Sequence, residues 1–239
     1  MAKIVGEAGK GINKLIRKRK IKILIWAAFF YVGLYFAYKA FLHSLKSSAI
    51  IAILGFAVLV RFLYSSVEKE TDEIGKRIKH ARKGKRGEEF IGSILEKLPD
   101  NYTVIHDIET PYGNVDHIVV GPTGVFVIET KSHHGRITER NGLLLRNNKP
   151  LEKNFIKQVL DNTFYIKEKI KESVGIEAYV KALLVFTNAY VDIKREIANV
   201  KIINKSFLLK AIKNSRTSLT DEQINSVEEL LLKLKEQST

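Results

Sequence analysis

Two long apolar runs near the start of the chain contrast with the alternating pattern that follows. Residues 23–38 (ILIWAAFFYVGLYFAY) and residues 49–60 (AIIAILGFAVLV) carry no charge. An α-helix needs roughly 20 apolar residues to cross a bilayer. The second run reaches that length if the side chain of Arg61 extends to the lipid headgroups. The pattern predicts two transmembrane helices, over 23–42 and 47–64, joined by the short turn HSLKSS.

Beyond residue 84 the pattern is that of an α/β domain. Strand patterns occupy 102–108, 114–120, 125–131, 179–188 and 200–204, and helical patterns occupy 84–98, 151–170, 206–214 and 218–237. We expect Pro150 to begin the second of these helices, because Pro is favoured at the first helical position. Thr220 and Gln223 should form a capping box at the start of the last one. These elements predict a mixed β-sheet core flanked by helices.

The charge distribution divides the chain near the same place. The net charge is +14, and residues 1–86 hold 19 of the 40 Lys and Arg but only 5 of the 26 Asp and Glu. Residues 87–239 are therefore neutral overall, which argues against a uniformly basic domain that binds nucleic acid. We predict a basic cytoplasmic segment over 1–22, a basic juxtamembrane linker over 65–83, and an α/β domain over 84–239.

Basic residues on both sides of the apolar runs indicate how the chain crosses the membrane. Eight Lys and Arg precede the first run against Glu7 alone, seven lie in 76–86, and the turn contributes Lys46. The positive-inside rule predicts a two-span protein of the cell membrane with both termini and the α/β domain in the cytoplasm. Its expected partners are the bilayer, through residues 21–64, and anionic lipid headgroups at the basic flanks.

Two alternatives for this first part of the chain stay open. The apolar runs could form a buried helical hairpin in a soluble protein. The basic run over 76–86 could also contact nucleic acid rather than lipid, and the two roles are compatible.

Three charged residues are expected on one face of the β-hairpin over 114–131. If Val120 and Val125 close the turn GPTG, Asp116 faces Glu129 directly, and Lys131 shares their face. Two carboxylates this close on a half-buried sheet repel each other, and a divalent cation relieves that repulsion. The chain has no Cys, and hard oxygen ligands indicate Mg²⁺ or Mn²⁺. The structural alternative is that Lys131 neutralises Glu129 on an exposed face.

Polar residues on two predicted helices can approach this trio. The helix over 84–98 places Gly87 near the centre of its apolar face and Glu88 on the flank, where it can enter a cleft. Gln158 and Asn162 are i,i+4 neighbours beside the apolar stripe of the helix over 151–170. They could contact a phosphate or a base of a substrate, or they could form a polar pair that caps the sheet edge. His117 alternates to the face opposite Asp116, where it packs or donates a hydrogen bond.

The spacing D-x12-E-x-K, with a Glu on a preceding helix, resembles the core of PD-(D/E)xK nucleases. The strings RGEEFIGSILEKL and VDHIVVGPTGVFVIETKSHHGRI are more specific and resemble the NERD family, the nuclease-related domain, over about residues 84–203. The resemblance implies a restriction-endonuclease-like sheet. It also implies catalytic positions for four residues: Glu88, Asp116, Glu129 and Lys131.

The chain departs from these patterns at two positions. Val115 stands where the name of the general motif has proline. The family resemblance places a Gln at 158, but Asn162 stands where related RecB-like nucleases have Tyr.

These features predict a membrane-anchored nuclease that hydrolyses phosphodiester bonds of DNA or RNA at the cytoplasmic face. Asp116 and Glu129 would hold the Mg²⁺ or Mn²⁺, Lys131 would position the attacking water, and Glu88 would complete the site. A non-catalytic module of the same fold, which binds nucleic acid or a protein partner at the membrane, is the main alternative. A membrane scaffold with structural carboxylates is the third.

Overall fold

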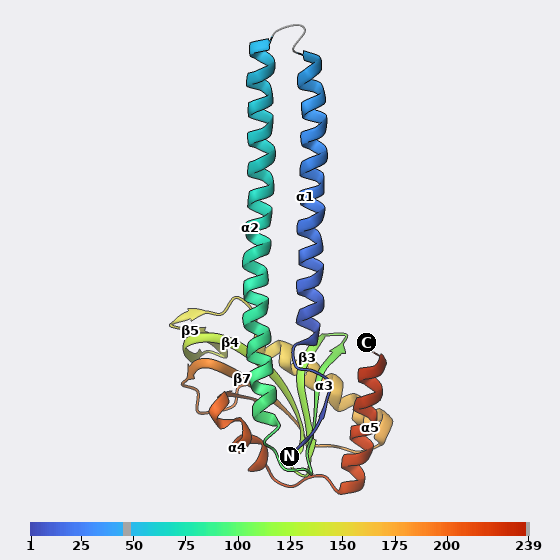
Figure 1. Ribbon diagram of the computed structural model, residues 1–239. Coiled ribbons are helices and arrows are strands. Elements are labelled where there is room, and N and C mark those ends of the chain that lie inside the picture. Colours follow the sequence, from blue (N-terminus) through green and yellow to red (C-terminus); the bar gives the residue numbers. More distant parts are fainter. Residues whose placement is uncertain (45–48, 238–239) are drawn as a thin grey trace. The chain divides into compact units, whose positions relative to one another are not determined.

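The computed structural model describes residues 1–44 and 49–237, and these form two compact units. Residues 12–82 make up a two-helix unit, and residues 1–11 together with 83–239 make up an α/β domain. Helix α1 (Lys10–Ser44) lies almost wholly in the two-helix unit (Figure 1). Helix α2 (Ala49–Leu95) starts in that unit and contributes its last turns to the α/β domain.

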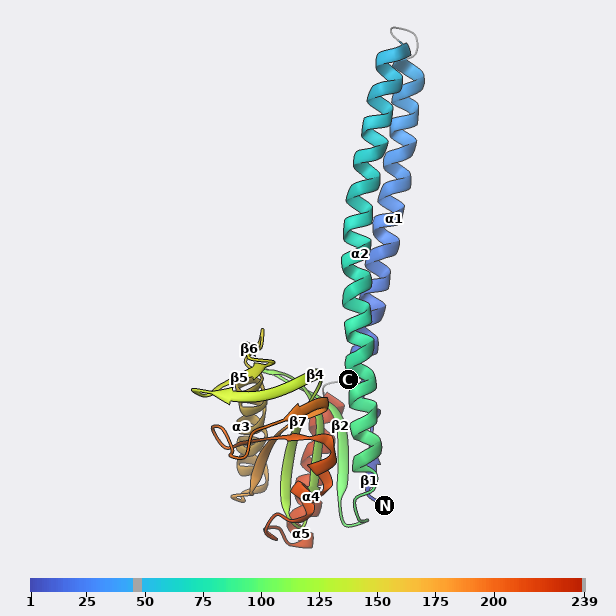
Figure 2. The ribbon, with the colours of Figure 1, turned by 90° about the vertical axis from the view of Figure 1, so that its left-hand side faces the viewer.

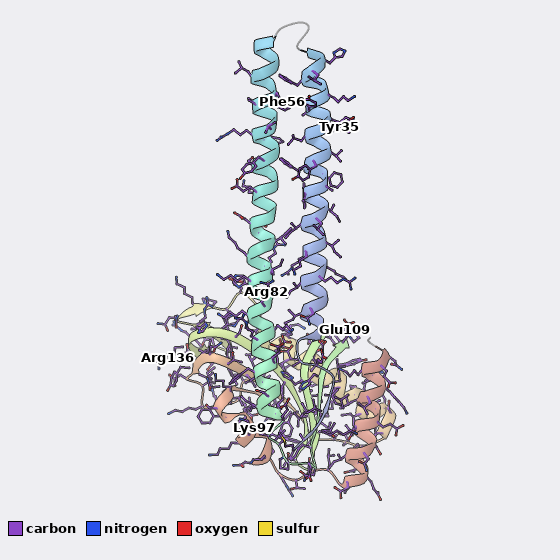
Figure 3. All side chains as sticks on the ribbon, in the orientation of Figure 1. Tyr35, Phe56, Arg82, Lys97, Glu109 and Arg136 are labelled. Carbon is purple, nitrogen blue, oxygen red and sulfur yellow. The ribbon has the colours of Figure 1, made fainter. Side chains whose placement is uncertain are left out.

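The two helices of the two-helix unit lie side by side and run in opposite directions (Figures 1 and 2). Near one end the rings of Phe41 and Phe56 lie 5.0 Å apart. Near the other end the guanidinium of Arg19 donates a hydrogen bond to the carbonyl of Arg77, at 2.7 Å. Side chains project outward along both helices (Figure 3), and Tyr35 is 56% exposed. The apolar side chains of α1 are thus only partly used to pack the two helices together.

One helical segment among the described residues, Ile16–His43, is long and apolar enough to cross a membrane. Its 28 residues span about 42 Å at 1.5 Å per residue, more than the roughly 30 Å of a hydrocarbon core. Only 6% of its apolar window is buried, which argues against a buried hairpin in a soluble protein. Such a segment is typical of a membrane span or of a signal sequence.

The second predicted span is not found as a further candidate among the described residues. The predicted range 47–64 begins at residues outside the described part, and the rest of it lies in α2. Residues 65–83, which were predicted as a linker, belong to the helix α2. Their many Lys, Arg and Glu residues are good helix formers, and Glu73 pairs with Arg77 one turn later.

The α/β domain is built on one mixed sheet of eight strands. The strands are β1 (Lys3–Val5), β2 (Thr103–Thr110), β3 (Gly113–Gly121), β4 (Gly124–Arg140), β5 (Leu143–Arg146), β6 (Lys149–Pro150), β7 (Val180–Val191) and β8 (Val200–Asn204). Strands β2 to β6 follow one another as antiparallel neighbours. β1 joins β2 in parallel, and β7 and β8 add in parallel beside β4.

Helices cover both faces of this sheet (Figure 2). Helices α3 (Phe155–Val174) and α5 (Asp221–Gln237) pack on one face. The last turns of α2 and the helix α4 (Leu208–Lys213), which follows the 3₁₀ turn η1 (Lys205–Phe207), pack on the other. Strands buried on both faces read as continuous apolar runs, as in VFVI of β4. The mixed α/β class predicted from the sequence is confirmed.

Two local predictions can be compared directly with the structure. Val120 pairs with Val125 across the β3–β4 turn, as predicted. The capping box of α5 is also confirmed. The N–H of Thr220 donates to Oε1 of Gln223 at 3.0 Å, and the N–H of Gln223 donates to Oγ1 of Thr220 at 3.3 Å.

The predicted start of α3 at Pro150 is wrong. The helix begins at Phe155, and the side chain of Asn154 caps it by accepting a hydrogen bond from the N–H of Lys157 at 3.0 Å. An Asn side chain satisfies a free helical N–H, which Pro cannot do. Pro150 instead pairs with Leu145 in the short strand β6, where an edge position tolerates its missing N–H.

Candidate active site

Four elements bring the predicted site residues toward one region of the α/β domain. Asp116 lies near the start of β3, and Glu129 and Lys131 lie on β4. Gln158 comes from α3, which covers one face of the sheet, and Glu88 comes from α2, which covers the other.

The antiparallel pairing of β3 and β4 places Asp116 beside Glu129. The register runs from Val120↔Val125 to His117↔Ile128, so Asp116 is the next residue on its strand and Glu129 the next on the neighbouring one. The backbone N–H of Thr130 donates a hydrogen bond to Oδ2 of Asp116 at 2.7 Å. Asp116 is 8% exposed and Glu129 is 3% exposed. Two carboxylates are therefore buried side by side.

Lys131 is held among three side chains. Its Nζ forms an ion pair with Oε1 of Glu129 and lies 4.4 Å from the centre of the Phe155 ring. It also donates to Oε1 of Gln158 at 3.4 Å, while Nε2 of Gln158 donates to Oε1 of Glu129 at 2.9 Å. The Lys131–Glu129 contact of the structural alternative is present, but on a buried face rather than an exposed one.

The last turns of α2 have the orientation that the sequence predicts. Gly87 is buried against β4 and β7, where an added Cβ would lie 3.4 Å from the side chain of Ser132. Glu89 points outward and pairs with Lys85 at 3.2 Å. Glu88, between them, is 8% exposed. A Cβ at this position would make ordinary van der Waals contacts, so α2 packs directly on the sheet here and carries Glu88 to the site.

Burial and mutual repulsion shift the ionisation of all three carboxyl groups toward the neutral form. Burial raises the pKa of Asp116 well above its usual value, and the charges of Glu129 and Glu88 raise it further. Burial also raises the pKa of Glu129, although Lys131 and Gln158 oppose the shift. Burial, followed by the charges of Asp107 and Glu129, raises the pKa of Glu88 to about 7. If all three carboxyl groups were ionised, Lys131 could not balance their negative charge.

The pKa of Glu88 predicts a specific dependence of stability on pH. Because folding raises this pKa from 4.5 to about 7, its contribution is fully present below pH 4.5 and is lost as the pH rises through 7. Without divalent cations, the chain should therefore lose up to about 3 kcal/mol of stability through this group between acid and mildly alkaline pH.

Urea-dependent proteolysis of the full chain in detergent and EDTA, at pH 5 and pH 8, measures this effect. Glu88→Gln should reduce the difference between the two pH values. Glu89→Gln, the matched control on the exposed side of the same helix turn, should reduce it only slightly, because the charge of Glu89 is the smallest of the effects that raise the pKa of Glu88. A pH difference that survives in Glu88→Gln at full size would contradict the shifted ionisation of Glu88.

Asp116 and Glu129 are the two side chains of the site with the oxygen atoms that a divalent cation prefers. Among the residues that the structure describes, no three or more Asp, Glu, His or Cys side chains are arranged to hold a metal ion. A cluster of three carboxylate ligands is therefore not formed there. Asp116 and Glu129 still fit a smaller role, because Mg²⁺ typically binds one or two carboxylates and keeps several of its waters. When both carboxylates are ionised, Lys131 balances only part of their negative charge, and a hard cation would balance the rest.

Two predicted polar residues lie apart from these contacts. Asn162 is 1% exposed, and its Oδ1 accepts a hydrogen bond from Oγ1 of Thr110 at 2.6 Å. It contacts the end of β2, whereas Gln158 contacts Glu129 and Lys131. His117 is fully buried, with its Nδ1 2.7 Å from Nδ1 of His106. Burial lowers the pKa of both imidazoles, so the pair is neutral.

Asp107 is a nearby acidic residue that the sequence patterns did not single out. Its backbone is left-handed, with φ of 63°, which interrupts the pairing of β2 with β3 between His106↔His117 and Ile108↔Val115. Its Oδ1 accepts a hydrogen bond from Nδ2 of Asn114 at 2.6 Å, and its charge acts on Glu88. An Asp inside a predicted strand is unfavourable there, and that signal could have identified it.

Residues 83–187 match the family model of the nuclease-related domain, NERD. This match supports the family resemblance and covers a segment that includes Glu88, Asp116, Glu129, Lys131 and Gln158. The NERD segment ends before Ile203, the limit that the sequence resemblance indicated. An uncharacterized protein of Bacillus anthracis is 48% identical over 61 residues, which are 23% of this chain and 29% of that protein. The chain thus matches less than a third of this curated relative's length. No solved structure matches the chain.

Proposed function

We propose that the chain is a membrane-anchored, divalent-metal-dependent nuclease whose active site faces the cytoplasm. The observation that carries the proposal is the buried carboxylate pair Asp116 and Glu129 beside Lys131, within a segment that matches a nuclease-related family. The anchor would be the apolar segment Ile16–His43, with a second span in α2. The substrate would be DNA or RNA.

Each residue of the site has a chemical role in this proposal. Asp116 and Glu129 would hold Mg²⁺ or Mn²⁺, which supplies Lewis acidity at a phosphoryl oxygen and a more acidic bound water. Lys131, held by Gln158 and the ring of Phe155, would orient the attacking water and offset negative charge on the phosphoryl group. Glu88, with a pKa of about 7, is suited to accept or return a proton near neutral pH.

The ion pair of Lys131 with Glu129 also favours a second candidate. A lysine that already neutralises the more buried carboxylate could serve a non-catalytic module of the same fold. Such a module would bind nucleic acid or a protein partner at the membrane without hydrolysis.

A cleavage assay separates these candidates. The full chain in detergent should cleave at least one of a panel of single- and double-stranded DNA and RNA substrates with Mg²⁺ or Mn²⁺, and none in EDTA. Lys131→Ala should lower the rate by about 100-fold, because it removes the charge that faces the phosphoryl group but leaves both carboxylates. Equal activity of Lys131→Ala and wild type would exclude this site, and no cleavage by wild type would favour the binding module.

A further inference from the structure

We propose that a groove beside the candidate active site binds single-stranded nucleic acid, with Tyr190 and Phe207 stacking on its bases. The proposal deepens the nuclease function and names the substrate class of the same site, and it rests on that function. We call this hollow the aromatic groove. It has a volume of about 590 Å³, and the lining residues used below are Thr187, Asn188, Tyr190, Asn204, Lys205 and Phe207.

The two aromatic rings that line the groove are more than half exposed. Tyr190 at the end of β7 is 68% exposed and Phe207 in η1 is 58% exposed. Phe90 on α2 is 46% exposed, and Nζ of Lys205 lies 4.5 Å from the centre of its ring. Exposed rings of this size cost free energy in water, and a base that stacks on them removes that cost.

The aromatic groove lies next to the candidate active site. Thr187 lines the groove, and its Cγ2 lies 3.7 Å from the position that a Cβ on Gly87 would occupy. Gly87 directly precedes Glu88. On the sheet, Lys131 pairs with Phe186, the residue before Thr187. The groove therefore adjoins the site on the Glu88 side, on the sheet face that α2 covers, whereas Glu129 and Lys131 contact α3 on the other face. A bound strand would reach the carboxylates past Glu88.

The charge beside the groove suits a phosphate backbone. The α/β part of the sequence is neutral overall, yet residues 197–220 contain five Lys and Arg and no Asp or Glu. Lys205 lies in the groove itself. A second hollow is lined by Lys201, Lys210 and again Phe207. Cations beside exposed rings form the usual surface for single strands, in which the backbone follows the charges and the bases stack.

The polar residues that line the groove together with the rings favour nucleic acid over a protein partner. A protein-docking surface typically presents a contiguous apolar patch. Here polar and charged residues (Asn188, Asn204 and Lys205) share the lining with Tyr190 and Phe207. A double helix is a poorer fit than a single strand, because its bases are already stacked on one another and leave no free faces for the rings.

Fluorescence anisotropy of end-labelled single strands, measured with the full chain in detergent and EDTA, tests the proposal without any cleavage. Tyr190→Leu and Phe207→Leu should each weaken binding of single-stranded DNA or RNA by about fivefold or more. Tyr190→Phe and Phe207→Tyr, which keep an aromatic ring, should bind as tightly as wild type. Phe164→Leu is the matched control, since Phe164 is 60% exposed on α3, which covers the other face of the sheet. Lys205→Gln should reduce the slope of log K against log salt by about 0.7.

The outcomes distinguish this proposal from the nuclease function. If wild type cleaves nucleic acid but both Leu variants bind single strands as tightly as wild type, the aromatic groove is not the binding surface. If the Leu variants bind more weakly although wild type cleaves nothing, the groove proposal stands and the nuclease function does not. Wild type that binds no single strand, or binds duplex as tightly as single strand with equal losses in Phe164→Leu, overturns the groove proposal.

Discussion

Asp116→Asn is expected to lower metal-dependent cleavage by about three orders of magnitude and, in EDTA, to stabilise the folded chain. The first effect follows because one of two proposed metal ligands loses its charge, and a bound cation contributes several kcal/mol to the transition state. The second follows because burial and the charges of Glu129 and Glu88 raise the pKa of Asp116. The neutral Asn removes that repulsion and keeps an oxygen for the N–H of Thr130.

Metal-dependent stability provides an independent measurement. In wild type, a cation at one hundred times its dissociation constant should add about 2.7 kcal/mol to the free energy of unfolding, and Asp116→Asn should lose this gain. If the carboxylates were only structural partners of Lys131, Asp116→Asn would leave stability in EDTA flat or lower it slightly, and metal would add nothing to wild type.

Urea-dependent proteolysis of the full chain, with EDTA or with Mg²⁺ or Mn²⁺, measures both effects on the same samples. Asp100→Asn is a suitable control because Asp100 is exposed in the turn after α2. It should change neither the stability in EDTA nor the gain with metal. Destabilisation of Asp116→Asn in EDTA would mean that repulsion among the buried carboxylates is weaker than the favourable contacts of Asp116.

Single-cysteine labelling should give an all-or-none difference between the two ends of the two-helix unit. Eight basic residues precede the first apolar run and seven follow in 76–86, so the positive-inside rule predicts that both flanks lie in the cytoplasm. The chain has no Cys, and each variant therefore carries one thiol. In intact cells, a membrane-impermeant maleimide should label His43→Cys, at the end of α1, but not Ser173→Cys on α3.

Labelling after the cells are made permeable is the control, and both variants should then react to the same extent. Reaction of Ser173→Cys in intact cells would place the α/β domain outside and separate it from cytoplasmic nucleic acid. Failure of His43→Cys to react in intact cells would contradict the two-span arrangement, because one end of α1 must reach the outer face in it.

Local pattern accounts for much of the α/β domain. Strands of period two, the turn GPTG and the capping box of Thr220 each depend on residues close together in the chain. The same holds for the turn of α2 in which Gly87 packs and Glu89 points outward. The register that brings Asp116 beside Glu129 followed from one turn, because each residue after the turn fixes its partner on the neighbouring strand.

These local patterns did not predict contacts between residues that are distant in the sequence. Strand β1 is three residues long and has no period of its own. It forms because β2 offers a free edge, and it joins the first residues of the chain to the α/β domain. The start of α3 was misplaced because Pro150 and Asn154 both resemble helix starts, and pairing of Pro150 with Leu145 decided between them.

The sequence by itself determined the mixed α/β class, the apolar segment of α1, and the face that Asp116, Glu129 and Lys131 share, since helix and strand periods are properties of neighbouring residues. Only the tertiary structure decided that Lys131 is held by Gln158 and Phe155, that Asp107 acts on Glu88, and that Tyr190, Lys205 and Phe207 meet in one groove. These contacts depend on how the helices and strands pack, and side chains remote in sequence acquire their charge environment and burial only when that packing is complete.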